Sequence, residues 1–263
     1  MSKRILYIDP VPSNKEELQP IADYLSSIKL SDTYLEVIST NSIAPLHVTY
    51  PSYEALSSVD LLKLIYYGVR NDFDAIIVGC FYDPMVMEAR EFAKASIIIG
   101  PCLSSLQIAE QLANRTTILS VGLKATHRIK QRVHEYGFDN KIASVRDIGM
   151  EVGDFCNLDI DTAEVFIEAG RKAIKEDGAE ALILGCSMNF TDYAIVQKAL
   201  NIPVIDSITA ALKKAELHTE LKQKFNWSTS QCGTLSAPPQ QEIDQFDMFK
   251  ELDPPIGQRI IVS

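Results

Sequence analysis

Apolar runs and amphipathic runs alternate along most of the chain. Short uninterrupted apolar runs, such as Arg4 to Ile8 and Thr116 to Val121, are typical of strands that are buried on both faces. Runs with apolar positions three and four residues apart, such as Val59 to Tyr66, predict helices that cover those strands. This alternation predicts βαβ units, and therefore an α/β fold with mainly parallel strands.

The order of elements can be predicted from the same pattern. We expect further strands at 34–38, 96–99 and 203–205 and a strand-like run at 259–262, with helices at 13–30, 57–66, 104–113, 124–136, 161–175, 191–200 and 207–224. Ser13 and Glu16 form a predicted capping box for the first helix. Residues 39–57 are predicted to form a long flap, and residues 140–160 to be the least regular part of the body.

One pattern occurs twice in the chain. Asp74 to Cys80 and Glu180 to Cys186, 106 positions later, each consist of an acidic residue, an apolar run and Gly-Cys. Each cysteine is expected just past the carboxyl end of a buried strand, where open α/β sheets bind ligands. Two equivalent thiols predict a pair that faces one substrate from opposite sides.

The chemistry of such a pair is proton transfer. We expect a helix to start soon after each Gly-Cys turn, with Asp83-Pro84 as the start after Cys80. Because a helix N-terminus lowers the pKa of a nearby thiol, we expect a lowered pKa for both Cys80 and Cys186. A thiolate can then remove a proton from one side of a carbon while a thiol delivers one from the other, without a cofactor. The backbone N–H groups expected to hold a substrate oxygen are those of Phe81, Tyr82, Ser187 and Met188. The alternative interpretation is that both cysteines are small packed residues.

Composition narrows the choice of partners. The 263 residues are enough for one large domain or two half-size lobes, and the formal charge of −10 argues against nucleic acid or an anionic membrane surface. No apolar run approaches the roughly 20 residues of a membrane span. The five cysteines are scattered and include no CxxC pair, which argues against a disulfide framework or a metal site and favours the cytoplasm.

The two Gly-Cys turns resemble the signature turns of the aspartate/glutamate/hydantoin racemase superfamily. The likeness extends from Ile8-Asp9-Pro10 to about His218, includes Ile98 to Pro101 and Ile202 to Asp206, and is greatest to the hydantoin and allantoin racemase branch. It implies that Cys80 and Cys186 are the acid/base pair of a cofactor-independent enzyme. It also implies two pseudo-symmetric flavodoxin-like lobes with mainly parallel four-stranded sheets, an active site in the cleft between them, and a homo-oligomer.

With that family in mind, we expect three parts. The first lobe comprises 1–100 and 205–224, the second comprises 101–204, and 225–263 form an extended C-terminal arm that can lie on a neighbouring subunit. The family's first turn usually reads Asn-Pro-Asn-Thr, whereas this chain has Asp9-Pro10-Val11-Pro12-Ser13. The predicted substrate-binding residues are Ser13, Phe81, Tyr82, Cys102, Ser120, Ser187 and Met188.

The leading hypothesis is a racemase or epimerase that acts on a carbon next to a carbonyl in a hydantoin-like or amino-acid-derived substrate. Tyr82 and Met85 replace small residues of the family and predict a less polar or aromatic substrate. Two alternatives remain open. One is a maleate-type cis–trans isomerase or a decarboxylase of the same superfamily, and the other is a non-catalytic ligand-binding relative.

Overall fold

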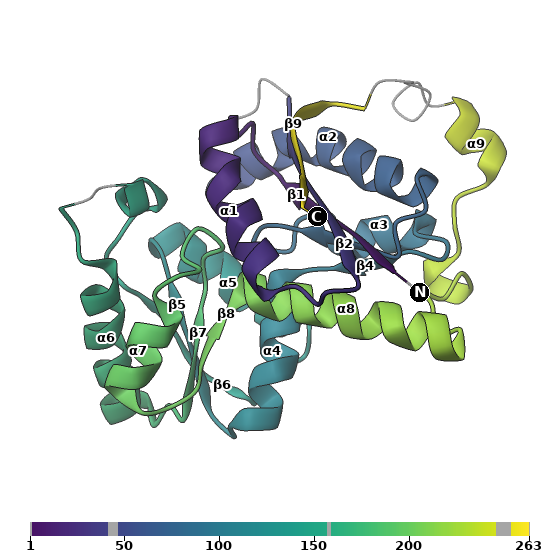
Figure 1. The fold of residues 1–263 in the computed structure, drawn as a ribbon. Helices are drawn as coiled ribbons and strands as arrows, with labels where there is room; N and C mark the ends of the chain where they lie inside the picture. Colours follow the sequence, from purple (N-terminus) through teal and green to yellow (C-terminus); the bar gives the residue numbers. More distant parts are fainter. Residues whose placement is uncertain (1, 42–46, 157–158, 246–253, 263) are drawn as a thin grey trace. The chain divides into compact units, whose positions relative to one another are not determined.

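The computed structural model describes residues 2–41, 47–156, 159–245 and 254–262, and they divide into two compact units (Figure 1). Unit 1 comprises Met1–Gly79, Asp83–Gly100 and Leu212–Ser263, and unit 2 comprises Cys80–Tyr82 and Pro101–Ala211. These bounds differ from the predicted lobes in three places. Cys80–Tyr82 belong to unit 2, the last long helix is divided between the units, and the segment after that helix belongs to unit 1.

Unit 1 is built on a five-stranded sheet. Its strands are β1 (Lys3–Asp9), β2 (Thr33–Thr40), β3 (Ala75–Val78), β4 (Ile97–Ile99) and β9 (Ile256–Val262), in the order β4-β3-β1-β2-β9. The first four are parallel, and β9 is antiparallel to β2. Its helices are α1 (Lys15–Ile28), α2 (Pro51–Arg70), α3 (Val86–Ala89), α9 (Gln240–Gln245), the short turns η1 (Arg90–Phe92) and η4 (Gly233–Leu235), and most of α8 (Ser207–Phe225).

Unit 2 repeats this strand order. Its strands are β5 (Thr116–Ser120), β6 (Ile142–Asp147), β7 (Ala181–Leu184) and β8 (Val204–Asp206), all parallel in the order β6-β5-β7-β8. Its helices are α4 (Pro101–Leu112), α5 (Leu123–Glu135), α6 (Thr162–Lys172), α7 (Tyr193–Leu200) and the short segments η2 (Val152–Cys156) and η3 (Ala173–Asp177). Numbered within its own unit, each set of four parallel strands has the order 2-1-3-4, which is flavodoxin-like. The predicted α/β class is confirmed, with β9 as an additional strand.

The cores explain why these segments form strands. In unit 1, α2 and α3 bury Leu64, Ile65 and Val86 against β1 and β3, whose alternate residues Leu6 and Ile76 are fully buried. In unit 2, α6 and α7 cover the corresponding face of β5 and β7. Because helices also cover the other face of each sheet, the central strands are apolar at nearly every position and show no alternation.

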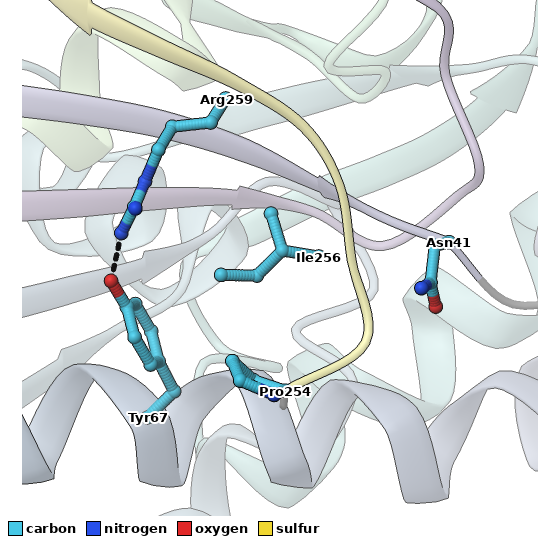
Figure 2. Close-up of a pocket in the computed structure, with 5 residues that line it drawn as sticks. All are labelled: Asn41, Tyr67, Pro254, Ile256 and Arg259. Carbon is cyan, nitrogen blue, oxygen red and sulfur yellow. Dashed lines mark hydrogen bonds between the residues drawn. The ribbon is translucent and has the colours of Figure 1, made fainter. Parts of the chain in front are cut away.

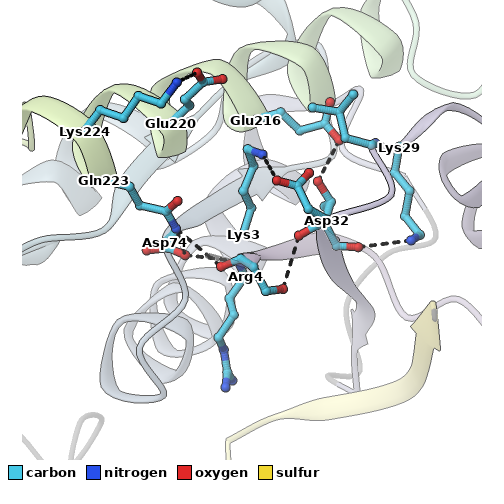
Figure 3. A network of polar contacts seen from close by, with 12 residues as sticks. Lys3, Arg4, Lys29, Asp32, Asp74, Glu216, Glu220, Gln223 and Lys224 are labelled. Atoms are coloured by element: carbon cyan, nitrogen blue, oxygen red, sulfur yellow. Dashed lines mark hydrogen bonds and ion pairs between the residues drawn. The ribbon is translucent and has the colours of Figure 1, made fainter.

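Helix α8 is fixed to unit 1 by polar contacts along its length (Figure 3). The Glu216 carboxylate accepts hydrogen bonds from the backbone N–H of Leu30 at 2.7 Å and from the Thr33 hydroxyl at 2.9 Å. Farther along, Lys222 forms an ion pair with Asp74 at 2.9 Å. The side chain of Glu216 is almost fully buried, so its hydrogen bonds to Leu30 and Thr33 anchor the helix more strongly than an exposed ion pair would.

Three predictions about local structure were wrong, and one was confirmed. Helix α2 begins at Pro51, so the predicted flap 39–57 shortens to a connection whose residues 42–46 lie outside the described residues. The first helix is capped by Asn14 with Glu17, not by Ser13 with Glu16. The segment 140–160 contains strand β6. The strand-like run predicted at 259–262 is confirmed as part of β9, which pairs with β2 of the same chain, and residues 246–253 of the predicted arm lie outside the described residues.

Candidate active site

Each Gly-Cys turn follows the third parallel strand of one sheet, β3 of unit 1 for Gly79-Cys80 and β7 of unit 2 for Gly185-Cys186. In unit 1, Ile8 pairs with Val78, and the Gly79 N–H donates to the Ile8 carbonyl at 2.8 Å. In unit 2, Leu119 pairs with Leu184, and the Gly185 N–H donates to the Leu119 carbonyl, also at 2.8 Å. The two cysteines therefore occupy equivalent positions at the carboxyl ends of equivalent strands.

Glycine precedes each cysteine because a side chain has no room there. A Cβ on Gly79 would overlap the buried Tyr7 ring, and one on Gly185 would lie 2.8 Å from the Leu119 carbonyl oxygen. The φ angle of neither glycine is in the left-handed region, so close packing and not backbone conformation selects this residue. The repeated glycine thus allows each strand end to pack against its neighbour.

The two thiols differ in exposure. Cys80 is buried, with 8% of its surface exposed, and Cys186 is half-buried. Burial raises the pKa of Cys186 from 9.0 to about 11, and hydrogen bonding by the backbone of Met188 and Asn189 lowers this pKa but only partly opposes the rise. The predicted lowering of the pKa of Cys186 is therefore wrong for this structure.

The helices that were expected to activate the thiols start too late to do so. After Cys80 the next helix, α3, begins at Val86, and after Cys186 the next helix, α7, begins at Tyr193. Asp83 is not an N-cap, since its φ of 51° is left-handed and its carboxylate fills the space left by the missing side chain of Gly100. Without a helix dipole beside the sulfur, burial determines the proton affinity of Cys186.

The turn after Cys80 is held by unit 2. Phe81 and Tyr82 are buried, and the Arg132 guanidinium of α5 donates from Nε to the Tyr82 carbonyl at 2.9 Å. Cys80–Tyr82 belong to unit 2, as does Cys186. The structure thus places both candidate catalytic cysteines in one compact unit.

Polar residues lie beside the Gly-Cys turns at the ends of the neighbouring central strands. Asp9 ends β1, is buried, and accepts a hydrogen bond from the Ser13 hydroxyl at 2.5 Å. Ser120 ends β5, is buried, shares a hydrogen bond with the Thr126 hydroxyl at 2.5 Å, and donates to the Arg146 carbonyl at 3.0 Å. Asp9 and Ser120 are equivalent in topology, since each follows the residue whose carbonyl accepts from Gly79 or Gly185.

Burial opposes ionisation of Asp9. It raises the pKa of this carboxyl from 3.8 to about 6, with a smaller contribution of the same sign from the negative charge of Glu17. Hydrogen bonds from the Ser13 hydroxyl and from the backbone of Val11 lower the pKa and offset part of the rise. Asp9 is therefore a carboxyl group that titrates near neutral pH beside one of the two candidate turns.

The other predicted site residues have varied environments. Cys102 is fully buried in the first turn of α4, Ser187 is half-buried, and Met188 is 42% exposed. All of the predicted site residues except Ser13 belong to unit 2. Among the described residues, no cluster of His, Cys, Asp or Glu has the arrangement of a metal site, and no helix is long and apolar enough to cross a membrane.

Sequence reasoning missed several residues around the candidate site. Asn189 is buried, donates its backbone N–H to the Cys186 carbonyl at 3.3 Å, and donates from Nδ2 to Asp192 at 2.7 Å. Asp9, Thr126 and Arg132 contact predicted site residues but were not predicted themselves. Only Asp9 carried a signal in the sequence, as a charged residue that directly follows a buried apolar run.

Comparison with known proteins adds independent findings. A family model described as Asp/Glu/Hydantoin racemase matches residues 5–215. The hydantoin racemase of Pseudomonas sp. (strain NS671) is 30% identical over 214 residues, which are 81% of this chain and 83% of that protein. The hydantoin racemase of Rhizobium meliloti is 30% identical over 192 residues, 73% of this chain and 79% of the relative. Allantoin racemase from Klebsiella pneumoniae has a similar structure, with a TM-score of 0.82 and 26% identity over 90% of this chain and 94% of that chain.

Proposed function

The chain belongs to the Asp/Glu/Hydantoin racemase family and is an isomerase, and we propose that it inverts a carbon next to a carbonyl in a hydantoin-like or amino-acid-derived substrate. The predicted branch of the family, that of the hydantoin and allantoin racemases, is confirmed by these relatives. The repeated strand-Gly-Cys arrangement in two sheets of equal strand order is the observation that carries the proposal.

In the proposed mechanism, Cys80 and Cys186 alternate as base and acid without a cofactor. One thiolate removes the proton from the substrate carbon, and the other cysteine, as a thiol, donates a proton to the opposite face. The electron pair left by the first step is held on the adjacent carbonyl oxygen as an enolate. Because burial raises the pKa of Cys186 to about 11, this residue is a thiol at neutral pH and acts first as the acid.

Substrate recognition is proposed for groups that lie near the two turns. Ser13, Ser120 and Ser187 contribute hydroxyl groups, and Cys102 lies in the first turn of α4. The aromatic side chains of Phe81 and Tyr82 and the exposed Met188 contribute apolar surface. This mixture supports a substrate with a carbonyl group and an apolar or aromatic substituent.

The proposal is tested by proton exchange. The protein is incubated in D₂O with single enantiomers of 5-substituted hydantoins, allantoin, aspartate and glutamate, and deuterium entry and optical rotation are followed. Loss of optical rotation with one deuterium gained per inversion is the expected result for at least one substrate. No exchange with any of them would contradict this proposal, and loss of carbon dioxide or a double-bond shift would indicate another reaction of the superfamily.

Cysteine variants test the two-base assignment. Cys80→Ser and Cys186→Ser are each expected to lower the rate of inversion by about a thousandfold or more, since a serine hydroxyl is a far weaker acid than a thiol. Cys232→Ser is the matched control, because Cys232 is exposed and outside the site. Racemisation at the native rate by Cys80→Ser or by Cys186→Ser would refute the assignment of the two cysteines as an acid/base pair.

We further propose a cytoplasmic homo-oligomer whose partner in the reaction is a small molecule and which contacts neither nucleic acid nor membrane. The free cysteines among the described residues support the compartment, and the acidic composition supports the absence of nucleic acid and anionic membrane as partners. The homo-oligomer is proposed from the resemblance to the family alone. Sedimentation of the purified protein measures the subunit number, and a mass equal to one chain at micromolar concentration would refute the oligomer.

A further inference from the structure

The C-terminal strand β9 lies outside the part of the chain that the family model matches, yet it is built firmly into unit 1 (Figure 2). The Arg259 guanidinium contacts both the nearly buried Glu36 carboxylate of β2 and the Tyr67 hydroxyl of α2. At the start of the strand, the Asn41 N–H donates to the Pro255 carbonyl at 2.8 Å. A shallow pocket of about 470 Å³ lies between these contacts.

The pairing of β9 with β2 is irregular at one position, and Ser39 lies there. The register shifts between Ile38 and Thr40, so Ser39 has no paired residue on β9. Its hydroxyl accepts a hydrogen bond from the Gln258 N–H at 3.0 Å instead. Gly257 permits this close approach, because a Cβ there would overlap the Thr40 carbonyl oxygen.

The Ser39 hydroxyl also contacts the turn that carries Ser13, a predicted substrate-binding residue. Ser39 is fully buried, and its Oγ donates to the Ser13 carbonyl at 2.9 Å. The Ser13 side chain in turn donates to Asp9, at the end of β1, and the Ser13 N–H donates to the Val11 carbonyl at 2.8 Å. A continuous series of hydrogen bonds therefore joins β9, through Ser39, to the turn 10–14 that presents Ser13.

We propose that β9 is a positioning element for the reaction, with the Ser39 hydroxyl linking the Gln258 N–H to the Ser13 carbonyl and so fixing the turn 10–14 beside Asp9. The inference rests on the proposed function insofar as Ser13 contacts substrate. It assigns a role to a segment that lies more than 200 residues away in sequence from the turn it holds. Ser39 and β9 act through Ser13 and do not touch the reacting atoms.

Two substitutions interrupt the series at different points. Gln258→Pro removes the donating N–H, and the irregular register there reduces the cost of a proline. Ser39→Ala removes the hydroxyl. Gln258→Ala is the matched control, because it changes the side chain at the same position and keeps the N–H. Circular dichroism and a melting curve establish which variants are folded.

The first readout is independent of activity. Hydrogen exchange of peptides that cover residues 10–17 should be about tenfold faster in Gln258→Pro and Ser39→Ala than in the native protein, because the turn loses an anchoring hydrogen bond. Peptides of unit 2 and the control Gln258→Ala should exchange as in the native protein. Equal protection of 10–17 in all four proteins would overturn the inference, whatever the enzyme turns out to catalyse.

The second readout uses the substrate identified by the exchange assay. Gln258→Pro and Ser39→Ala should each raise KM about threefold to tenfold with a smaller change in kcat, because Ser13 is misplaced while both cysteines are intact. They should also move the ionisation of Asp9 to higher pH, since the Ser13 hydroxyl normally lowers the pKa of this group against the effects of burial and of Glu17. Unchanged KM and pH profile, with faster exchange of the turn, would overturn the positioning role but leave the racemase proposal intact.

Discussion

The two strand ends that carry Gly79-Cys80 and Gly185-Cys186 have the same backbone hydrogen bonding and strand order, but the polar residue at the end of the neighbouring strand differs. In unit 1 the strand beside Gly79 ends in Asp9, a buried carboxyl whose pKa is raised to about 6, and in unit 2 the strand beside Gly185 ends in Ser120, which does not titrate. Each is hydrogen-bonded to a hydroxyl at 2.5 Å, that of Ser13 or of Thr126. The comparison shows that duplicated topology fixes where polar groups are presented, while single residues decide their proton affinity.

The largest expected effect on stability comes from the two glycines that allow each strand end to pack closely against its neighbour. Gly79→Ala should lower the free energy of unfolding by about 3 kcal/mol or more, because the new methyl group overlaps the buried Tyr7 ring. Gly185→Ala should cost about 2 kcal/mol, since its methyl group would lie 2.8 Å from the Leu119 carbonyl oxygen and 2.9 Å from Ile118 Cγ2. Urea denaturation measures both. Gly153→Ala, at an exposed position with nothing within 4 Å, is the control and should change stability by less than about 0.5 kcal/mol.

The next effect concerns the residue that distinguishes the two sites. Because the pKa of Asp9 is about 6 in the folded protein and 3.8 is its ordinary value, the folded state loses stability as the pH rises from about 4 to about 6. The loss at neutral pH is at most about 3 kcal/mol. Asp9→Asn keeps an acceptor for Ser13 and should be more stable than the native protein at pH 7 but not at pH 4. Equal stability of Asp9→Asn and the native protein at pH 7 would show that ionisation of Asp9 does not destabilise the folded state.

Alkylation of Cys186 tests the environment of unit 2. With a pKa of about 11, this thiol is mostly protonated at pH 8, and it should react with iodoacetamide roughly tenfold to a hundredfold more slowly than in the protein unfolded by urea. The rate should rise steadily between pH 8 and pH 10, as read by mass spectrometry of the Cys186 peptide. A rate that levels off below pH 9 would show a thiolate that the protein stabilises.

The smallest effect concerns Ser120. Ser120→Ala removes the hydrogen bond to the Arg146 carbonyl and the one shared with Thr126, and it should cost about 1 kcal/mol of stability. Unlike the change at Asp9, this cost should not vary between pH 4 and pH 7, because no ionisable side chain takes part. Thr126→Ser keeps the hydroxyl and serves as the control. If the stability cost of Ser120→Ala changed with pH, an ionisable group would act at the Ser120 site as Asp9 does at the other strand end.

The strands that carry the site could be predicted because their burial on both faces leaves uninterrupted apolar runs. β6 could not, since Ile142–Asp147 is an edge strand whose residues are mostly half-buried, and its sequence lacks the strong apolar signal of β5 and β7. The first helix cap was misassigned because Ser13 and Asn14 are adjacent candidates. In the structure the Asn14 side chain accepts from the Glu17 N–H, while the Ser13 hydroxyl donates to Asp9.

Proton affinities could be predicted less well than positions. The sequence indicates where Cys186 lies, but its pKa depends on burial and on the start of α7, and that helix begins seven residues after the cysteine. The link from Gln258 through Ser39 to Ser13 has no sequence signature at all, because it joins segments more than 200 residues apart. Long-range contacts of single hydroxyl groups require coordinates.

The antiparallel pairing of β9 with β2 has a consequence for how the chain folds during synthesis. Residues 101–211 of unit 2 are contiguous and can pack as soon as they leave the ribosome, whereas unit 1 needs α8 and then a strand that ends at Val262. Until that last segment emerges, the edge of β2 is unpaired and open to another chain. A truncated or stalled product should therefore aggregate through its first-synthesised half.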